Sequence, residues 1–363
     1  MNRVVLTIVS VIILAAAVSA QKIAKPTLTP VDATESQRVL IEEGIRLHDK
    51  QDYDSAIKKY ELVLAANPDC TLAMYELAMT LYTKGNTEKA VVMAVRGSKY
   101  RASELPLFYM TIANALDDVG KAKEAIEIYR DALAILKSEK GLGVHLSNIE
   151  YNLGVTYVKQ KQYKEARTEL KKAVEYNNSY ASPHYLLAEV FVGSHYKVPA
   201  FLSAARLVSL EYNTPRTDRA VQIIRSVLKA AEKDEKTGNI NIFVDMNAPA
   251  DEGNFGGIEL FLGTLMVVKD DKAKAKTEEE KFADAIDTLI ALIAEDKKLK
   301  DTFVGQNYIP FIVEMRLKGH TTAFAHIILY KSGNAGALKW LTQNTPKMTA
   351  FLQWAKDYQL PSK

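Results

Sequence analysis

The sequence predicts a mainly α-helical fold, in which repeated helical hairpins stack into a superhelix and a smaller, mostly helical α+β domain follows. One amphipathic pattern recurs in AIKKYELVLAANPD at 56–69, AIEIYRDALAIL at 125–136 and ARTELKKAVEYN at 166–177. Apolar residues at helical spacing on one face of each copy indicate helices that pack side by side. After Lys236 this pattern ends, and alternation of apolar and polar residues indicates a change of structure.

Composition limits the class of protein. The chain has 363 residues, of which 48% are hydrophobic and 25% charged, so we expect two regions rather than one domain. A formal net charge of +3 gives no field that would attract nucleic acid, and we expect no nucleic-acid partner. Cys70 is the single cysteine, which excludes an intramolecular disulfide and favours a buried apolar side chain over a nucleophile. The sequence predicts no cofactor and no metal site.

The first 20 residues have the pattern of a signal peptide. MNR is a short basic segment, VVLTIVSVIILAAAV is apolar, and Val18-Ser19-Ala20 supplies the small residues that a signal peptidase requires, so we expect cleavage before Gln21. An uncleaved anchor is the alternative, but the apolar run is shorter than the roughly 20 residues of a spanning helix. We therefore expect export to the periplasm or beyond, as in a bacterial envelope, with no stable membrane insertion after cleavage. Residues 21–36 contain two prolines and no helical period, which indicates a flexible leader.

Small residues mark the period of the repeats. The first series, at spacings of 34, 35, 41 and 34, is Gly44, Ala78, Ala113, Gly154 and Ala188. The second series lies twelve residues further on and is Ala56, Ala90, Ala125, Ala166 and Ala200. Paired amphipathic helices with a period near 34 resemble the tetratricopeptide repeat family, and the resemblance covers residues 37–214 as five repeats. The fourth unit, YNLGVTYVKQKQYKEARTELKKAVEYN, carries the family pattern most fully.

The resemblance implies how these positions pack. Small residues such as Gly154 and Ala166 are expected where the two helices of one repeat cross, while Tyr60 and Tyr129 are expected to fill the gap to the next repeat. The longer spacing before the fourth unit predicts a longer helix or an extended loop. The fifth unit departs from the pattern at Pro199, so its first helix is better supported than its second. The amphipathic segment 215–236 is expected to be a helix that caps the last repeat.

The resemblance also implies a concave groove lined by the first helix of each repeat. The expected groove residues are Ile41, Ile45, Tyr75, Met79, Tyr82, Met110, Asn114, Tyr151, Val155, Tyr185 and Glu189. Tyrosine gives a large contact area with a polar tip, which suits an extended peptide or a partner helix, although tyrosine also serves packing in such repeats. Some family members hold the terminal carboxylate of a chaperone in this groove. The corresponding positions here cannot pair with a carboxylate and are Ile41, Ile45, Glu76, Leu107 and Thr111.

Residues 237–363 resemble no family. The segment TGNINIFVDMNAP predicts a strand ended by Pro249, GIELFLGTLMVV is ambiguous between strand and helix, and KDDKAKAKTEEEK is expected to be a solvated loop. Residues 278–298 predict a helix whose apolar face is Phe282, Ile286, Leu289, Ile290 and Ile293. Short helices divided at Pro310, Gly319, Gly333 and Pro346 are expected to follow. A stripe of Phe351, Trp354 and Tyr358 is expected in the core.

Catalysis is not predicted. His320 and His326 are six residues apart and point to different faces of a helix, while Asp251, Glu252 and Glu259 could form paired carboxylates or be solvated surface. The predicted function is an exported scaffold that binds a protein or peptide partner in its concave groove, for the assembly or organisation of a cell-envelope complex. The alternative is a C-terminal domain that binds a ligand or glycan, or hydrolyses one, and that the repeats only position. The sequence makes no prediction of oligomeric state.

Overall fold

The computed structural model describes residues 23–229, 231–233, 240–242, 250–265 and 276–360. The chain divides into two compact units, one ending at Gln162 and one beginning at Tyr163. Each unit is described by itself. The boundary falls inside the fourth predicted repeat, between its two helices.

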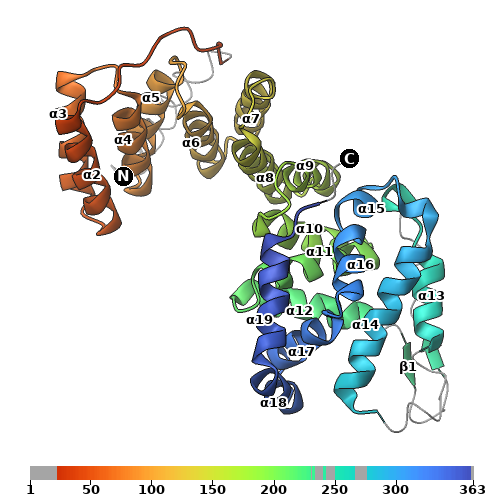
Figure 1. Cartoon of the computed structure of the whole chain (residues 1–363). Coiled ribbons are helices and arrows are strands. Elements are labelled where there is room, and N and C mark those ends of the chain that lie inside the picture. The colour runs from red at the N-terminus through yellow and green to blue at the C-terminus, as the bar shows by residue number, and fades with distance from the viewer. Residues whose placement is uncertain (1–22, 230, 234–239, 243–249, 266–275, 361–363) are drawn as a thin grey trace, which may run out of the picture. The chain divides into compact units, whose positions relative to one another are not determined.

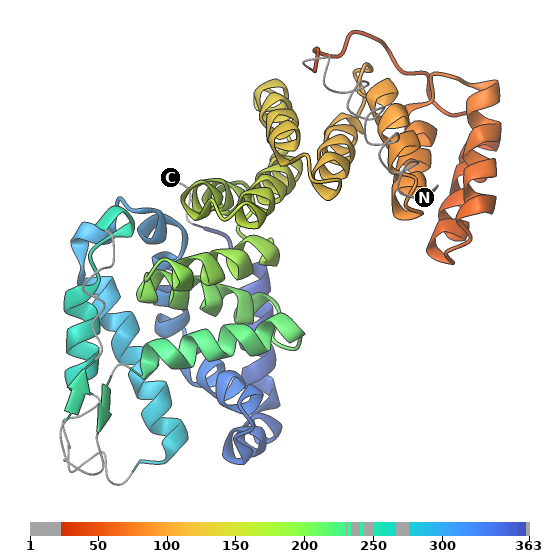
Figure 2. The ribbon, with the colours of Figure 1, turned by 180° about the vertical axis from the view of Figure 1, so that it is seen from behind.

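The first unit is an array of helical hairpins (Figures 1 and 2). Its helices are α2 (Glu35–Asp49), α3 (Tyr53–Ala66), α4 (Thr71–Thr83), α5 (Thr87–Gly97), α6 (Leu105–Asp118), α7 (Ala122–Leu136) and α8 (Gly143–Lys159). Each hairpin packs its two helices on each other, and α3 packs on α4 as α5 does on α6. The extra residues before the fourth repeat lengthen α8, which has 17 residues, and form a short loop after Leu136.

The turn inside each hairpin has one residue in the left-handed region, and its recurrence confirms the period. The five turns, including the one in the second unit, have positive φ at Gln51 (63°), Gly85 (87°), Gly120 (80°), Lys161 (59°) and His195 (65°). Glycine adopts this conformation without steric cost, whereas a residue with a Cβ is strained there. Two of the five turns therefore have glycine at this position, and the other three have a residue that is strained there.

Gly44 shows why the first helix needs a small residue at its crossing point. A Cβ on Gly44 would lie 2.4 Å from Cε1 of Tyr60, on the second helix of the same hairpin. Tyr60 is fully buried and shares a cluster with Leu77 and Leu81 of the next hairpin. The expectation that Tyr60 fills the gap to the next repeat is therefore incomplete, because its ring also fills the crossing within its own hairpin.

The leader is an ordered strap where the structure describes it. The amides of Thr27 and Leu28 both donate to the Lys99 carbonyl at 3.0 Å, and Leu28 forms a parallel bridge with Tyr100. The Val31 amide donates to the Asp69 carbonyl at 3.0 Å. The expectation of a flexible leader over 21–36 is therefore wrong for residues 27–31, because main-chain hydrogen bonds hold them to two loops between hairpins. Residues 1–20 lie outside the described part of the chain.

The second unit begins with α9 (Tyr163–Tyr176), α10 (Ala181–Gly193), α11 (Lys197–Leu210) and α12 (Pro215–Leu228). The second helix of the fifth repeat, α11, is well formed and is buried from Val198 to Ser209. Later helices cover it and its neighbours, since α19 packs on α11, α17 on α12 and α15 on α9. The division between repeats at 37–214 and a separate domain at 237–363 is thus not the structural one.

The expected capping helix at 215–236 is shorter than predicted. Helix α12 ends at Leu228, and β1 (Ala231–Lys233) follows and pairs antiparallel with β2 (Ile240–Ile242). The ladder has three residues on each strand, so the described C-terminal part is helical apart from this ladder. The predicted strand continues through 243–249 and the predicted charged loop falls largely on 266–275, both outside the described residues. Helix α13 (Gly256–Leu265) resolves the ambiguous segment as a helix.

The C-terminal helices confirm the predicted divisions. The elements are η1 (Ala250–Glu252), α14 (Glu278–Glu295), η3 (Lys297–Leu299), α15 (Phe303–Asn307), α16 (Ile309–Leu317), α17 (Thr321–Lys331), α18 (Ala335–Gln343) and α19 (Thr345–Asp357). Thr277 begins α14 with a capping box to Glu280, and Ile286, Leu289, Ile290 and Ile293 are buried as expected. Phe351 and Tyr358 are buried, and Trp354 stacks on Phe311 with ring centroids 5.0 Å apart.

Candidate functional site

The predicted groove residues lie on the first helices of the hairpins. Ile41 and Ile45 are on α2, Tyr75, Met79 and Tyr82 on α4, Met110 and Asn114 on α6, Tyr151 and Val155 on α8, and Tyr185 and Glu189 on α10. Ile41 is 1% exposed and belongs to the core, so its assignment to a binding groove is wrong. The others are half-buried. All but Tyr185 and Glu189 belong to the first unit.

Polar groove side chains tie one hairpin to the next. The Tyr82 hydroxyl on α4 donates to the Asp118 carboxylate on α6. Asn114 on α6 accepts from Asn152 of α8 at 3.2 Å and from the Tyr129 hydroxyl. Burial raises the pKa of both tyrosines, so the hydroxyls stay protonated donors. Tyr82 and Asn114 therefore have a structural role in addition to any contact with a partner.

Glu76 on α4 is a half-buried acidic side chain next to the predicted groove residue Tyr75 and was not itself predicted to bind a partner. Burial, together with the charges of Asp49 and Glu104, raises the pKa of its carboxyl. A half-buried carboxylate with like-charged neighbours favours a cation that replaces its lost hydration. Tyr75 lies next to it and packs edge-on against Phe108, with ring centroids 6.1 Å apart. Tyr75, Met79 and Met110 are half-buried as well, so these predicted groove positions offer apolar side chains and Glu76 adds a carboxyl on α4.

The two predicted residues on α10 have partners on α12. Glu189 accepts from Arg219 at 2.7 and 3.0 Å, and this hydrogen-bonded pair raises the pKa of the guanidinium. The Arg216 guanidinium lies over the Tyr185 ring, 5.8 Å from its centroid. Because the fifth first helix already has a neighbour in α12, these residues stabilise the end of the array.

The carboxylates Asp251 and Glu252 form a salt-bridge cluster with α9. Glu252 is 1% exposed and accepts from Arg167 Nε at 3.0 Å and Lys171 Nζ at 2.7 Å. Asp251 pairs with Arg167 at 2.5 Å and accepts from the Tyr196 hydroxyl. Burial opposes the charge of Asp251, but Tyr196 and Arg167 outweigh it and lower the pKa of the carboxyl. Glu252 is therefore not solvated surface, whereas Asp251 is about half-exposed, and both carboxylates are in ion pairs.

Buried polar groups elsewhere in the second unit also have structural partners. His184 Nε2 donates to the Asn178 carbonyl at 2.8 Å, so Nδ1 accepts from the Tyr308 hydroxyl at 2.9 Å. Burial lowers the pKa of His184 to about 3, and the ring is neutral. Arg206 donates to the Ala355 carbonyl at 2.8 Å, and burial lowers its pKa to about 10. These contacts join α10 and α11 to the C-terminal helices.

The two histidines of the C-terminal region have different aromatic neighbours, and His320 precedes α17 while His326 lies within it. His326 stacks on Trp340 with centroids 4.1 Å apart, and His320 tilts against Trp354 at 5.1 Å. Within the described ranges no group of three or more His, Cys, Asp or Glu side chains could hold a metal ion. Among those same residues no helix is both long and apolar enough to cross a membrane.

Two family models match the chain, and both describe the tetratricopeptide repeat, over residues 41–104 and 106–190. Residues 41–190 are tetratricopeptide repeats. Helices α10 and α11 form a further hairpin, which begins inside the match and ends beyond it. Both models describe a repeat that forms a helical scaffold, and neither describes an enzyme.

Solved structures of other repeat proteins are similar to about half of the chain. The structure of Pseudomonas aeruginosa PilF is 16% identical, with a TM-score of 0.46, and covers 53% of this chain and 84% of that one. PilW, a type IV pilus biogenesis factor, is 15% identical with a TM-score of 0.40 over 54% of this chain and 100% of that one. TTC0263 of Thermus thermophilus is 18% identical with a TM-score of 0.42, over 52% of this chain and 99% of that one. No curated protein sequence matches the chain.

Proposed function

We propose that this protein is an exported scaffold that binds a protein partner in the groove of its first unit and so organises a complex of the cell envelope. Export rests on the signal-peptide pattern of residues 1–20. The assignment of the groove as the binding site is supported by the half-buried apolar side chains of Tyr75, Met79 and Met110, which a partner's apolar side chains would cover.

The observation that carries this proposal is the acidic and apolar character of the groove around Glu76. Its carboxyl is half-buried, and its raised pKa reflects burial and the neighbouring Asp49 and Glu104. A Lys or Arg of the partner would neutralise this charge, and the flanking aromatic and methionine side chains would take apolar residues. The partner segment is therefore expected to be basic and amphipathic.

The alternative function of the C-terminal domain, ligand or glycan binding or hydrolysis, has less support. The carboxylates that would serve it, Asp251 and Glu252, are held in ion pairs with Arg167 and Lys171. A carboxylate that two cations already neutralise has less capacity for general acid or base catalysis. We propose that this region instead completes the helical array that begins at α9.

The test is co-purification of partners from an envelope fraction with the full chain. A Met79→Glu and Met110→Glu double variant places charges in the groove and is expected to lose the partner that wild type captures. Val92→Glu is the matched control, because Val92 is an apolar residue of α5 that is 56% exposed and lies on a second helix.

The result that contradicts the proposal is equal capture by the double variant and by wild type. Equal loss with Val92→Glu would also contradict it, because the convex side would then contribute as much as the groove. Circular dichroism of each variant checks that the helices are intact.

A further inference from the structure

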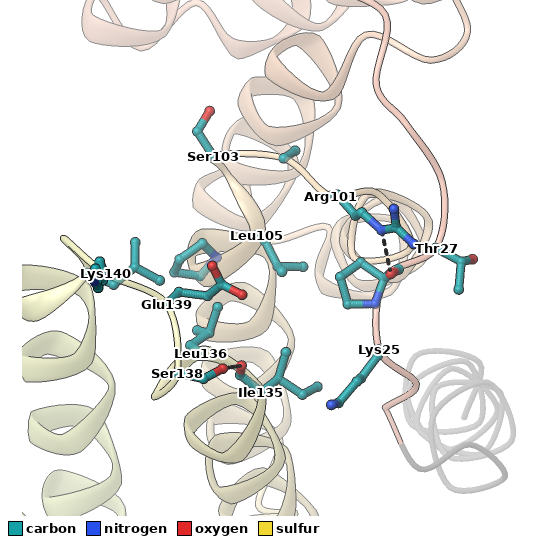
Figure 3. Close-up of a pocket in the computed structure, with 14 residues that line it drawn as sticks. Lys25, Thr27, Arg101, Ser103, Leu105, Ile135, Leu136, Ser138, Glu139 and Lys140 are labelled. Carbon is teal, nitrogen blue, oxygen red and sulfur yellow. Dashed lines mark hydrogen bonds between the residues drawn. The ribbon is translucent and has the colours of Figure 1, made fainter.

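The first unit has a pocket on the edge that carries the loops between hairpins, away from the predicted groove residues. Its volume is about 660 Å³, and Figure 3 shows the side chains that line it. They come from the start of the strap (Lys25 to Thr27), the loop before α6 and the start of α6, and the end of α7 with the loop that follows. A pocket of this size can hold one or two residues of a ligand.

The pocket is lined by apolar and basic side chains. Leu105, Pro106 and Leu142 supply apolar surface. The cations are Lys25, Arg101 and Lys140, and the single carboxylate is Glu139. The structure records no ion pair between any of these cations and another residue of its described ranges. Arg101 Nε donates to the Pro26 carbonyl at 3.3 Å, which joins the strap to the pocket wall. The excess of positive charge favours a ligand that carries a carboxylate beside an apolar group.

The same edge already holds an extended polypeptide. The strap hydrogen-bonds through its main chain to the loop at Asp69 and to the loop at Lys99, which connect successive hairpins. The pocket lies at the next loop of this series, after Leu136, and Lys25, Pro26 and Thr27 of the strap line it. Residues 21–24 of the chain are QKIA, which contain a lysine and no carboxylate, so they do not complement the charge of the pocket.

We infer that this pocket is a second binding site, which takes an acidic, extended segment of another protein, with a carboxylate at the basic side chains and an apolar side chain at the apolar ones. The site differs from the groove in the sign of its charge, because the groove is acidic around Glu76. One partner could thus be held by its basic helix in the groove while a second is held by an acidic segment at the edge. The inference goes beyond the proposed function and does not depend on it.

The experiment measures fluorescence polarisation of labelled hexapeptides with the full chain. The probe is a hexapeptide of alternating Leu and Glu, called the Glu peptide. In the two control peptides every Glu is replaced by Gln or by Lys. We expect the Glu peptide to bind and the Lys peptide not to bind. In a Lys25→Glu and Lys140→Glu double variant the affinity for the Glu peptide is expected to fall by about ten-fold, since two favourable charge contacts become unfavourable.

Lys137→Glu is the matched control, because Lys137 is exposed in the same loop and does not line the pocket. Ser138→Trp tests the volume independently of charge, since a large ring at this lining position occupies the pocket, and the same loss of binding is expected. The inference is wrong if no Glu peptide binds, if the double variant and Lys137→Glu weaken binding equally, or if Ser138→Trp binds as wild type does. It is also wrong if Met79→Glu with Met110→Glu abolishes binding of the Glu peptide, because the peptide would then occupy the groove.

Discussion

The ion pairs of Glu252 give the sharpest test of how the second unit is held together. Glu252→Gln keeps the shape of the side chain and removes its charge. The buried side chain of Arg167, which is 9% exposed, then loses its buried partner and retains only Asp251, whose side chain is 52% exposed. We therefore expect the change to destabilise the second unit.

The size of the effect follows from the exposure of each partner. Removing one member of a fully buried pair costs about 3–5 kcal/mol, because an unpaired charge remains in a medium of low dielectric. Lys171 is 25% exposed and can regain hydration, which lowers the cost. We expect a loss of about 2–3 kcal/mol in the free energy of unfolding. Arg167→Met combined with Glu252→Gln is expected to recover part of this loss, since the unpaired cation is then absent.

Tryptophan fluorescence isolates this unit. Trp340 and Trp354 are the two tryptophans of the chain, and both lie in the second unit, so urea unfolding followed by fluorescence reports that unit. With a slope of about 2 kcal/mol per M urea, the midpoint is expected to fall by about 1 M. Asp284→Asn is the control, because its pair with Lys276 is about half-exposed, and we expect a change below about 0.5 kcal/mol. Equal stability of Glu252→Gln and wild type, or an equally large effect of Asp284→Asn, would refute the reasoning.

The remaining predictions concern the first unit and are measured by circular dichroism. Lys161→Gly relieves a positive φ of 59° and is expected to stabilise by about 0.5–1 kcal/mol, whereas Gly85→Ala, at a φ of 87°, should destabilise by about 1 kcal/mol. Gly44→Leu places a Cβ 2.4 Å from Tyr60 Cε1 and is expected to cost more than about 2 kcal/mol; an unchanged melting curve would contradict the crossing geometry. Glu76→Gln should raise the melting temperature at pH 7, because burial raises the pKa of the carboxyl and its charged form destabilises the fold. The difference should vanish below about pH 4, where wild type is protonated folded and unfolded; a difference that persists there would exclude this cause.

The period of small residues was enough to predict the hairpins, because a helix crossing restricts a position to glycine or alanine whatever surrounds it. Gly44 faces Tyr60 at such a crossing, and Ala56, Ala78, Ala90 and Ala113 of the first unit are fully buried. The structure adds a feature with the same period, since each turn has one left-handed residue, such as Gly85. Local patterns of this kind are readable from sequence because the interacting residues are close along the chain.

The strap was not predictable, since it takes part in these contacts through its own main chain. Hydrogen bonds from Thr27 and Leu28 to the Lys99 carbonyl require no particular side chain, and two prolines in a polar segment look the same in a flexible leader. The salt-bridge cluster was missed for a related reason. Arg167 and Glu252 are 85 residues apart in sequence, and neither has a local pattern that indicates burial. Ile41 was wrongly assigned to the groove, because repeat register alone does not separate a groove position from a core position.

The packing of α9–α12 against the C-terminal helices decides how binding at the groove and at the pocket should be tested. A cut after Lys236 follows the sequence period, but it removes α19 from α11 and Asp251 from Arg167. The buried faces of α9 and α11 would then be exposed to water, and such a fragment would fail to bind whether or not the groove recognises the partner. Loss of binding by that fragment therefore cannot assign recognition to the C-terminal region. Point variants in the full chain avoid this ambiguity, because Met79, Met110, Lys25 and Lys140 are far in sequence from every contact that joins α9–α12 to the C-terminal helices.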